Sequence, residues 1–317
     1  MSNGSGKEVT RSTRITPRAL SRVFGRAVSG WWNDNVPRMG ASLAYYTLFA
    51  LAPVLVVAIA IGGLVFGAAA VRGEIVAQIQ GLVGRQGGQA VEAMLEGASR
   101  PGTSALATAA GVLTFFLGAT GAFLELQTSL NTIWRVKPKN DGSFLRALLM
   151  QRVISFGLVV ALGFLLLTSL LVSAALAAIH NYLGTSFPGI VVLWEALNVL
   201  VSLAVITLLF ALIYKVLPDV KLAWRDVWVG ALVTAGLFSI GKLVIGLYLG
   251  TTSVASTYGA AGSVVVVLVW VYYSAQIILL GAEFTRAYVE QFGKRPPAED
   301  FATKDTASKK QTSVEGR

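Results

Sequence analysis

The segment GSVVVVLVWVYYSAQIILLGAEFTRA, residues 262–287, contains no charged residue before Glu283. The hydrocarbon core of a bilayer is about 30 Å thick, and about 20 apolar residues in a helix cross it. The segment therefore predicts a transmembrane helix. The whole chain agrees, since 55% of its 317 residues are hydrophobic, only 13% are charged and the mean hydropathy is +0.67. Soluble domains carry about 25% charged residues, so this composition excludes an ordinary water-soluble protein.

Further apolar stretches of comparable length occur at residues 40–69, 105–133, 152–179, 190–214 and 227–249. We therefore expect an all-α polytopic membrane protein with six transmembrane helices in one membrane domain, residues 37–290. A cleaved signal peptide is the alternative for the first stretch, because three alanines at 68–70 look like a cleavage site. However, that apolar run begins only at residue 40 and is about twice as long as a signal-peptide core.

The positions of Lys and Arg predict the orientation. Four segments, 1–39, 134–152, 215–226 and 286–317, carry 22 of the 26 basic residues, and the intervening loops carry three. Basic residues concentrate in cytoplasmic loops, so both termini are expected in the cytoplasm. The net charge of +10 follows from this topology and predicts no nucleic-acid partner. The chain lacks cysteine, which excludes disulfides and thiolate metal sites.

The segments around the spans carry their own patterns. Residues 17–36 form an amphipathic helical pattern in which Arg18, Arg22 and Arg26 lie on the face opposite apolar residues and tryptophans. This pattern is typical of a helix at the membrane interface, with the arginines near lipid head groups; packing against the protein's own cytoplasmic surface is the alternative. Residues 71–102 suggest an outer loop of two helices broken at 84–88. Residues 1–16 and the cytoplasmic tail 291–317 are expected to be disordered.

Charged residues inside the spans are the first candidates for function, because lipid rejects them. They are Glu125, Glu195, Lys242 and Glu283. At about 1.5 Å per residue, Lys242 is closest in depth to Glu195, and Glu125 is the second candidate for an ion pair. We expect these residues to contact a substrate or ion. Alternatively, Lys242 extends to the interface, or a buried pair only fixes helix register.

Uncharged polar residues extend this set. Tyr272 and Gln276 share a helix face with Glu283, and Gln127 and Asn131 lie one turn apart near Glu125. Tyr45 and Tyr46 enter the first span. Together they predict a polar seam inside the membrane domain that could contact a substrate, although interhelical hydrogen bonds would use the same residue types.

Several ordered motifs resemble the YihY/BrkB family of bacterial inner-membrane proteins. They are RMGASLAYYT (38–47), LQTSLNTIW (126–134), YKVLPD (214–219), GLYLG (246–250), YGAAG (258–262) and WVYYSAQ (270–276). The resemblance implies six membrane helices in the inner (plasma) membrane and no settled activity. Members often carry the label of a tRNA-processing ribonuclease. A metal-dependent nuclease needs clustered His and Asp ligands, and this chain has one histidine, His180, in an expected outer loop.

Two functions remain. The first is a transporter or flippase of a lipid or another amphiphilic envelope component, working through the polar seam. The second is a non-transporting scaffold for envelope-assembly or lipid-handling partners. We expect membrane lipids as partners, with envelope-assembly proteins or self-association under the second function. No enzyme is expected, because no nucleophile–base pair or metal-ligand set is recognisable, and no cofactor or metal is predicted.

Overall fold

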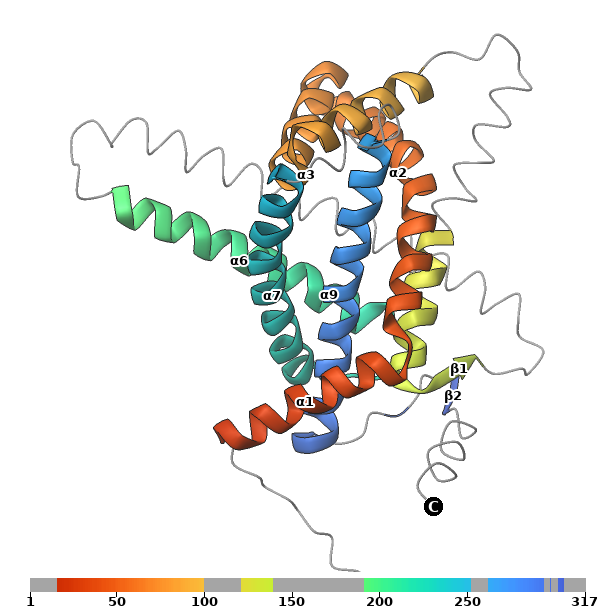
Figure 1. Cartoon of the computed structure of the whole chain (residues 1–317), viewed down its shortest axis with the longest axis vertical. Helices are drawn as coiled ribbons and strands as arrows, with labels where there is room; N and C mark the ends of the chain where they lie inside the picture. The colour runs from red at the N-terminus through yellow and green to blue at the C-terminus, as the bar shows by residue number, and fades with distance from the viewer. Residues whose placement is uncertain are drawn as a thin grey trace, which may run out of the picture.

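The computed structural model describes residues 16–99, 121–138, 191–251, 262–293, 297 and 302–304. These parts are mainly helical, which confirms the all-α class. The central element is α9 (Gly262–Phe292), which contacts α1 (Pro17–Asn33), α2 (Val36–Phe66), α3 (Ala68–Ser99) and α7 (Trp224–Thr251). The remaining long helix, α6 (Val191–Val216), packs against α7. In Figure 1, α2 and α7 stand on opposite sides of α9.

Apolar burial explains this arrangement. The main core cluster contains residues of α2, the helical stretch 121–134, α6, α7 and α9, among them Leu130, Ile133, Tyr214, Val227 and Leu279, each nearly or fully buried. Each buried side chain of this size contributes about 1.5–3 kcal/mol when it leaves water. Because lipid replaces water around a membrane helix, close packing between the helices also contributes to this core.

Three helices in the described residues are long and apolar enough to cross a membrane: Ala196–Val216, Trp224–Tyr248 and Val264–Phe292. They coincide with the last three predicted spans, and α9 continues five residues beyond the predicted end at 287. The helix α2 covers most of the first predicted span. It ends before Gly67, whose φ of 84° is a conformation that glycine adopts at no steric cost, so the helix ends three residues earlier than predicted. The second predicted span is described, and helical, only over 121–133, and the third, 152–179, lies outside the described residues.

The first helix, α1, lies across one end of the bundle in Figure 1. Its N-terminus is capped by Thr16, whose hydroxyl accepts a hydrogen bond from the Ala19 N–H. A turn separates it from α2, and Asn35 in this turn adopts a left-handed conformation with φ of 55°. The predicted helix 17–36 is thus confirmed over Pro17–Asn33.

Two expectations for α1 can be compared with its contacts. Its fully buried side chains, Val23 and Ala27, pack against Phe284 and Tyr288 of α9, so the helix does pack on the protein itself. A second apolar stripe, one helical turn apart at each step, remains 43–70% exposed and consists of Leu20, Phe24, Val28 and Trp32. The arginines at 18, 22 and 26 are exposed as well. One face of α1 therefore binds α9, and another remains available to a membrane.

At the opposite end of the bundle, α3 folds back on itself. Arg72 and Glu96 form an ion pair of 3.5 Å although 24 residues separate them. A straight helix would place these residues about 36 Å apart. The close approach of Gly88 to the Gln80 side chain leaves no room for a Cβ atom at residue 88. This geometry agrees with the two helical arms that the sequence suggested for 71–102.

A two-stranded antiparallel sheet joins distant parts of the chain. Its strands are β1 (Val136–Pro138) and β2 (Ala302–Lys304), and Lys137 pairs with Thr303. The backbone carbonyl of Pro297 also accepts a hydrogen bond from the Lys221 N–H, at 3.0 Å. The expectation of a disordered tail over 291–317 is therefore wrong for residues 302–304, because β1 supplies a pairing edge that the sequence of the tail alone does not reveal.

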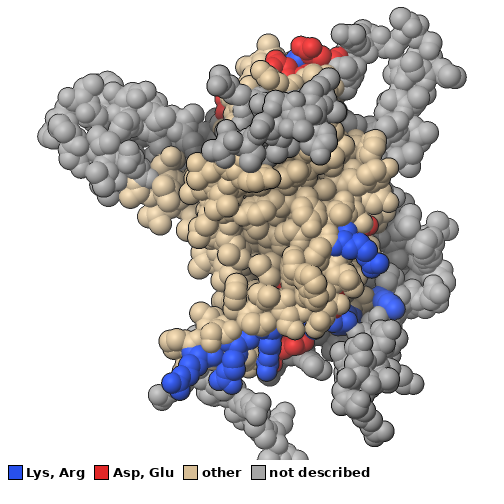
Figure 2. Space-filling view, in the orientation of Figure 1, with Lys and Arg blue, Asp and Glu red and all other residues tan. Residues whose placement is uncertain are grey.

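Charge is distributed unevenly between the two ends. Figure 2 shows Lys and Arg side chains along the α1 end, whereas acidic side chains gather at the α3 end. The surface between them, formed by the long helices, is mostly uncharged in this view.

Candidate functional site

Asp219 is buried, with 6% of its surface exposed, in a polar niche formed with Gln127 and Asn131. Its carboxylate accepts hydrogen bonds from Gln127 Nε2 at 3.0 Å and from Asn131 Nδ2 at 2.7 Å. The Asn131 Oδ1 in turn accepts from the Asp219 backbone N–H at 2.8 Å. These contacts fasten the loop after α6 to the helical stretch 121–134. Because the contacts satisfy both oxygens of the carboxylate, the Asp219 niche is a structural joint.

A second polar group, the Asp34 cluster, consists of Asp34, Arg135, Glu283, Arg286 and Glu290. Asp34 accepts from Arg135 Nη2 at 2.5 Å and from Arg286 Nη1 at 3.1 Å, and only 3% of its side chain is exposed. Arg286 also donates to the Ile133 carbonyl at 2.8 Å and lies 3.5 Å from Glu283 and 3.3 Å from Glu290. Charge-assisted bonds are stronger than neutral ones. The cluster therefore ties the α1–α2 turn to α9 and to the end of the 121–134 helix.

A third contact joins α6, α7 and α9 through Tyr214. Its hydroxyl donates to the Ile278 carbonyl at 2.6 Å and lies 3.0 Å from the Thr234 hydroxyl. Gly281 of α9 faces both side chains so closely that a Cβ atom there would overlap them. Tyr214 is 1% exposed, so this contact is also an internal joint.

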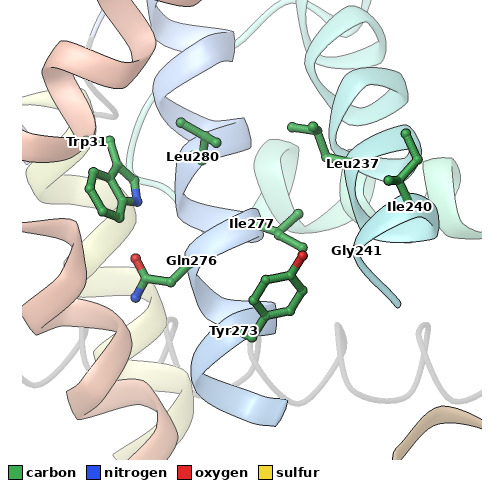
Figure 3. A pocket seen from close by; sticks show the side chains of 8 residues that line it. All are labelled: Trp31, Leu237, Ile240, Gly241, Tyr273, Gln276, Ile277 and Leu280. Atoms are coloured by element: carbon green, nitrogen blue, oxygen red, sulfur yellow. The ribbon is translucent and has the colours of Figure 1, made fainter. Parts of the chain in front are cut away.

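The cavity that differs from these joints is a groove between α7 and α9, with a volume of about 320 Å³. The residues that line this α7/α9 groove are Trp31, Leu237, Ile240, Gly241, Tyr273, Gln276, Ile277 and Leu280. Its walls are almost entirely apolar. In Figure 3 the side-chain amide of Gln276 turns toward Trp31, and the Tyr273 hydroxyl turns toward α7.

Gln276 is one of four described residues, with Ser129, Glu283 and Gln291, that have a buried side-chain polar atom without a hydrogen-bond partner. Both Nε2 and Oε1 are buried, and neither has a hydrogen-bond partner in the part of the chain that the structure describes. The amide packs against Gly40 of α2, where a Cβ atom would overlap Nε2. An unpaired buried amide costs about 1–3 kcal/mol. Such a group is a candidate for ligand contact, but its polar atoms lie on the α2 side of α9 and are not directed at α7.

The structure separates the residues that the sequence placed in one polar seam. Gln127 and Asn131 belong to the Asp219 niche, and Glu283 belongs to the Asp34 cluster. Only Gln276 lines the groove. The aromatic candidates are largely exposed on the helix surface, with Tyr45 at 58%, Tyr46 at 39% and Tyr272 at 37%. A single continuous seam is therefore not formed by the described residues.

Lys242 lies in α7, within one of the helices that are long and apolar enough to span a membrane. It is half-buried, and it does not line the groove, although its neighbour Gly241 does. Within the described ranges it forms no ion pair, and Glu125, also half-buried, is not its partner. Glu195 lies in α6, but its side chain is outside the described residues. The sequence correctly placed Lys242 in a helix that can span a membrane. It did not determine which side of the helix the lysine side chain faces.

Sequence reasoning missed Asp34, Asp219, Arg135 and Arg286. One signal could have found the two aspartates, because each is one of only two acidic residues in a segment whose other charges are basic. An acid in that position is expected to pair with a base or a buried amide. Among the described residues, no three His, Cys, Asp or Glu side chains are arranged to hold a metal ion. His180 lies outside the described ranges.

Comparisons with known proteins agree over most of the chain. The family profile described as virulence factor BrkB matches residues 27–305. A UPF0761 membrane protein of Ralstonia nicotianae is 30% identical over 274 residues, which cover 84% of this chain and 57% of the relative. One from Verminephrobacter eiseniae is 31% identical over 80% of this chain and 58% of its own length. One from Alteromonas mediterranea is 28% identical over 90% and 94%.

Length differs among these relatives. The chain spans only somewhat more than half of the Ralstonia and Verminephrobacter proteins, at 57% and 58%, but nearly all of the Alteromonas protein. No solved structure matches the chain.

Proposed function

We propose that this chain, which belongs to the virulence factor BrkB family of membrane proteins, moves a lipid or another amphiphilic envelope component across or within the membrane as a transporter or flippase. The observation that carries the proposal is the α7/α9 groove. Its walls come from α7 and α9, two helices long and apolar enough to span a membrane. An apolar groove lined by a few polar groups, such as the Tyr273 hydroxyl, fits an amphiphile, which has an apolar chain and a polar end.

The size of the groove restricts the cargo. Ligand pockets are typically about 300–1,000 Å³, and this groove, at about 320 Å³, is at the lower limit. It accommodates one chain of an amphiphile at a time. Trp31 closes one part of the groove, and tryptophan is frequent where apolar groups meet polar ones at membrane interfaces. A chain that enters between α7 and α9 would keep its polar end near α1.

The test is reconstitution of the purified protein in liposomes with fluorescent phospholipids, followed by dithionite reduction to measure scrambling. Ile240→Trp fills the groove, because Ile240 lines it and is 63% exposed. Leu243→Trp is the matched control, on the same helix, equally exposed and outside the groove. We expect Ile240→Trp to stop transport and Leu243→Trp to retain it. Equal rates in protein-free and protein-containing liposomes, for envelope lipids and amphiphiles alike, would refute transport.

Lys242 receives a separate test in the same assay. If it contacts the anionic part of the cargo, Lys242→Ala should lower transport of anionic lipids more than that of zwitterionic lipids. Lys242→Arg keeps the charge and should restore the preference. Equal transport by both variants and the unmodified protein would remove Lys242 from the pathway, while the groove hypothesis would still depend on Ile240→Trp.

A scaffold without transport is the second candidate, and the polar joints favour it. The Asp34 cluster and the Tyr214 contact fix α9 to its neighbours, and the Asp219 niche fastens the loop after α6 to the helical stretch 121–134. A rigid bundle is suited to holding envelope-assembly or lipid-handling proteins, or a second copy, at its surface. Affinity purification with and without α3 substitutions tests this candidate. Stable partners that are lost with an α3 variant, together with no liposome activity, would favour the scaffold.

We also propose six membrane spans with both termini in the cytoplasm of a bacterial cell, in the inner membrane. The excess of basic side chains at the α1 end supports this orientation. Because the chain has no cysteine, single cysteines report topology without background. Arg22→Cys on α1 should be protected from an impermeant maleimide in intact cells, and Glu92→Cys on α3 should react. The reverse pattern would invert the topology.

Membrane lipids are the partners proposed for α1. Its exposed arginines, Arg18, Arg22 and Arg26, have no ion-pair partner among the described residues and flank an exposed apolar stripe. Each basic residue near an anionic surface contributes about 1 kcal/mol. Replacing all three by glutamine should reduce the anionic lipid retained by the purified protein. Unchanged retention would exclude this role.

A further inference from the structure

In the Asp34 cluster, Glu283 lacks the hydrogen-bond donors that a buried carboxylate requires. The residue is 2% exposed, and its Oε1 has no hydrogen-bond partner in the described part of the chain. Its Oε2 lies 3.5 Å from Arg286 Nη1, which is longer than a usual hydrogen bond. A carboxylate that is buried without hydrogen bonds is costly. This carboxyl group therefore needs a bonding partner that the described residues do not supply.

The two arginines of the cluster direct their hydrogen atoms elsewhere. Arg286 Nη1 carries two hydrogen atoms, and it donates to Asp34 Oδ2 at 3.1 Å and to the Ile133 carbonyl at 2.8 Å. Arg135 Nη2 donates to Asp34 Oδ1. Asp34 thus receives a hydrogen bond from each arginine, whereas neither arginine donates to Glu283 in the part of the chain that the structure describes.

Asp34, in the turn after α1, and Glu283, in α9, are adjacent. Both lie beside the same Nη1 atom of Arg286, at 3.1 and 3.5 Å, and their carboxyl groups are in hydrogen-bond contact. Gly30 of α1 closes another side, because a Cβ atom there would overlap the Glu283 carboxyl group. A carboxylate only accepts hydrogen bonds, but a protonated carboxyl group also donates one. A proton between the two groups would give Glu283 the bond that it lacks.

We propose that the Asp34 cluster binds one proton, which Glu283 carries and donates to the Asp34 carboxylate, and that this proton keeps α1 docked on α9. The inference goes beyond the proposed function and does not depend on transport. Asp34 is the charged partner, because both arginines donate to it. Without the proton, two carboxylates would lie side by side, and two carboxylates that share a site do not readily ionise together. Loss of the proton therefore weakens the contact between α1 and α9.

The charged neighbours of Glu283 set the direction of the pH response. They are Asp34, Arg135 at the end of the 121–134 stretch, and Arg286 and Glu290 on α9 itself. The charged side chains of α1 and α2 are exposed arginines, at 18, 22, 26 and 38. The docked state holds the proton and the separated state does not require it, so low pH favours docking and rising pH weakens it.

The first measurement is infrared spectroscopy of the purified full chain in detergent micelles at neutral pH. The carbonyl stretch of a protonated carboxyl group lies at a higher frequency than the bands of a carboxylate, so the two forms are distinguishable. We expect the unmodified protein to show a protonated-carboxyl band that Glu283→Gln removes. Glu290→Gln is the matched control, because it is the same change on the same helix at a side chain that is 36% exposed. It should retain the band.

A second variant tests whether the proton depends on Asp34. Asp34→Asn removes the negative neighbour, so Glu283 becomes the carboxylate that compensates Arg286. The band should then disappear although Glu283 is still present. A band that persists in Asp34→Asn would show that burial alone retains the proton, and it would overturn the inference.

The second measurement follows the docking of α1 through a buried residue. Ala27 is fully buried against α9, so Ala27→Cys should react with a maleimide only when α1 separates. Gly25→Cys, at an exposed position of the same helix, corrects for the effect of pH on the thiol. The ratio of the two rates should rise with pH, by up to about tenfold per pH unit for release of one proton. In a Glu283→Gln background the amide donates to Asp34 at every pH, so the ratio should stay constant.

The outcomes separate this inference from the transport proposal. An unmodified protein without a protonated-carboxyl band, or a band that Glu283→Gln does not remove, would overturn the proton site. A ratio that does not change with pH in the unmodified background, or that changes equally with Glu283→Gln, would overturn the link to α1. If both signals appear and the liposomes show no transport, only the proposed function fails.

Discussion

Replacing Asp34 by alanine should destabilise the folded protein by about 3 kcal/mol. The Asp34 carboxylate is 3% exposed and pairs with Arg135 at 2.5 Å and Arg286 at 3.1 Å. Removing one partner of a buried ion pair costs about 3–5 kcal/mol. The lower value applies because Arg286 keeps Glu283 and Glu290 as partners, and because 37% of the Arg135 side chain is exposed and can be hydrated.

The assay is unfolding of the purified protein in mixed micelles by increasing dodecyl sulfate, followed through the fluorescence of its seven tryptophans. Glu290→Ala is the matched control, because Glu290 contacts the same arginine at 3.3 Å but is 36% exposed. It should cost less than about 1 kcal/mol. If Asp34→Ala destabilised the protein no more than Glu290→Ala, the Asp34 cluster would not be the joint between α1 and α9 that its geometry indicates.

Three other changes test the remaining contacts. Asn131→Leu removes one hydrogen bond from the Asp219 carboxylate and one from its backbone N–H, and it should destabilise the protein by about 3 kcal/mol in the same unfolding assay. An unchanged midpoint would contradict the role of the Asp219 niche. Gly281→Ala adds a methyl group that would overlap Thr234 and Tyr214, so it should lower the free energy of unfolding by about 1–3 kcal/mol. Alanine at Gly236, where a Cβ atom meets nothing within 4 Å, should not lower it. Cysteines in place of Arg72 and Glu96 should cross-link through a short bifunctional maleimide within one chain, and a failure to do so would show that α3 is straight.

The helices of this protein were predictable where their pattern is local. An apolar run fixes a spanning helix, as in residues 262–287, and the four-residue spacing of the arginines fixes the polar face of α1. The end of α2 was placed three residues too late, because glycines also occur inside spans and only the backbone conformation of Gly67 distinguishes the stop. The local sequence pattern thus predicts that these helices exist more reliably than it predicts the residues at which they end.

The polar contacts were predictable only in part, because their partners are distant in the sequence. Gln127 and Asn131 were correctly grouped on one helix face, but Asp219, which joins them, lies 88 residues beyond Asn131. The contact between Arg286 and Asp34 spans 252 residues. Hydropathy and helical spacing carry no information about such pairs. Lys242 shows the same limit. Its position in the sequence indicates its depth along the helix, but it does not indicate which neighbouring residue its side chain contacts.

The distribution of satisfied and unsatisfied polar groups along α9 bears on the choice between transport and scaffold. Toward its C-terminal end, Arg286 and Glu283 are held by ion pairs in the Asp34 cluster, and within the described residues Glu283 Oε1 and Gln291 Oε1 have no hydrogen-bond partner. At its middle, the Ile278 carbonyl accepts from Tyr214, whereas the Gln276 amide packs against Gly40 of α2 and has no hydrogen-bond partner in the described residues. Displacing the bound end would break several charge-assisted bonds, whereas rearranging side chains around Gln276 breaks none. A transport cycle consistent with these contacts therefore keeps the α1 end fixed and opens or closes the groove where Gly241 of α7 lies against Ile277 and Tyr273 of α9.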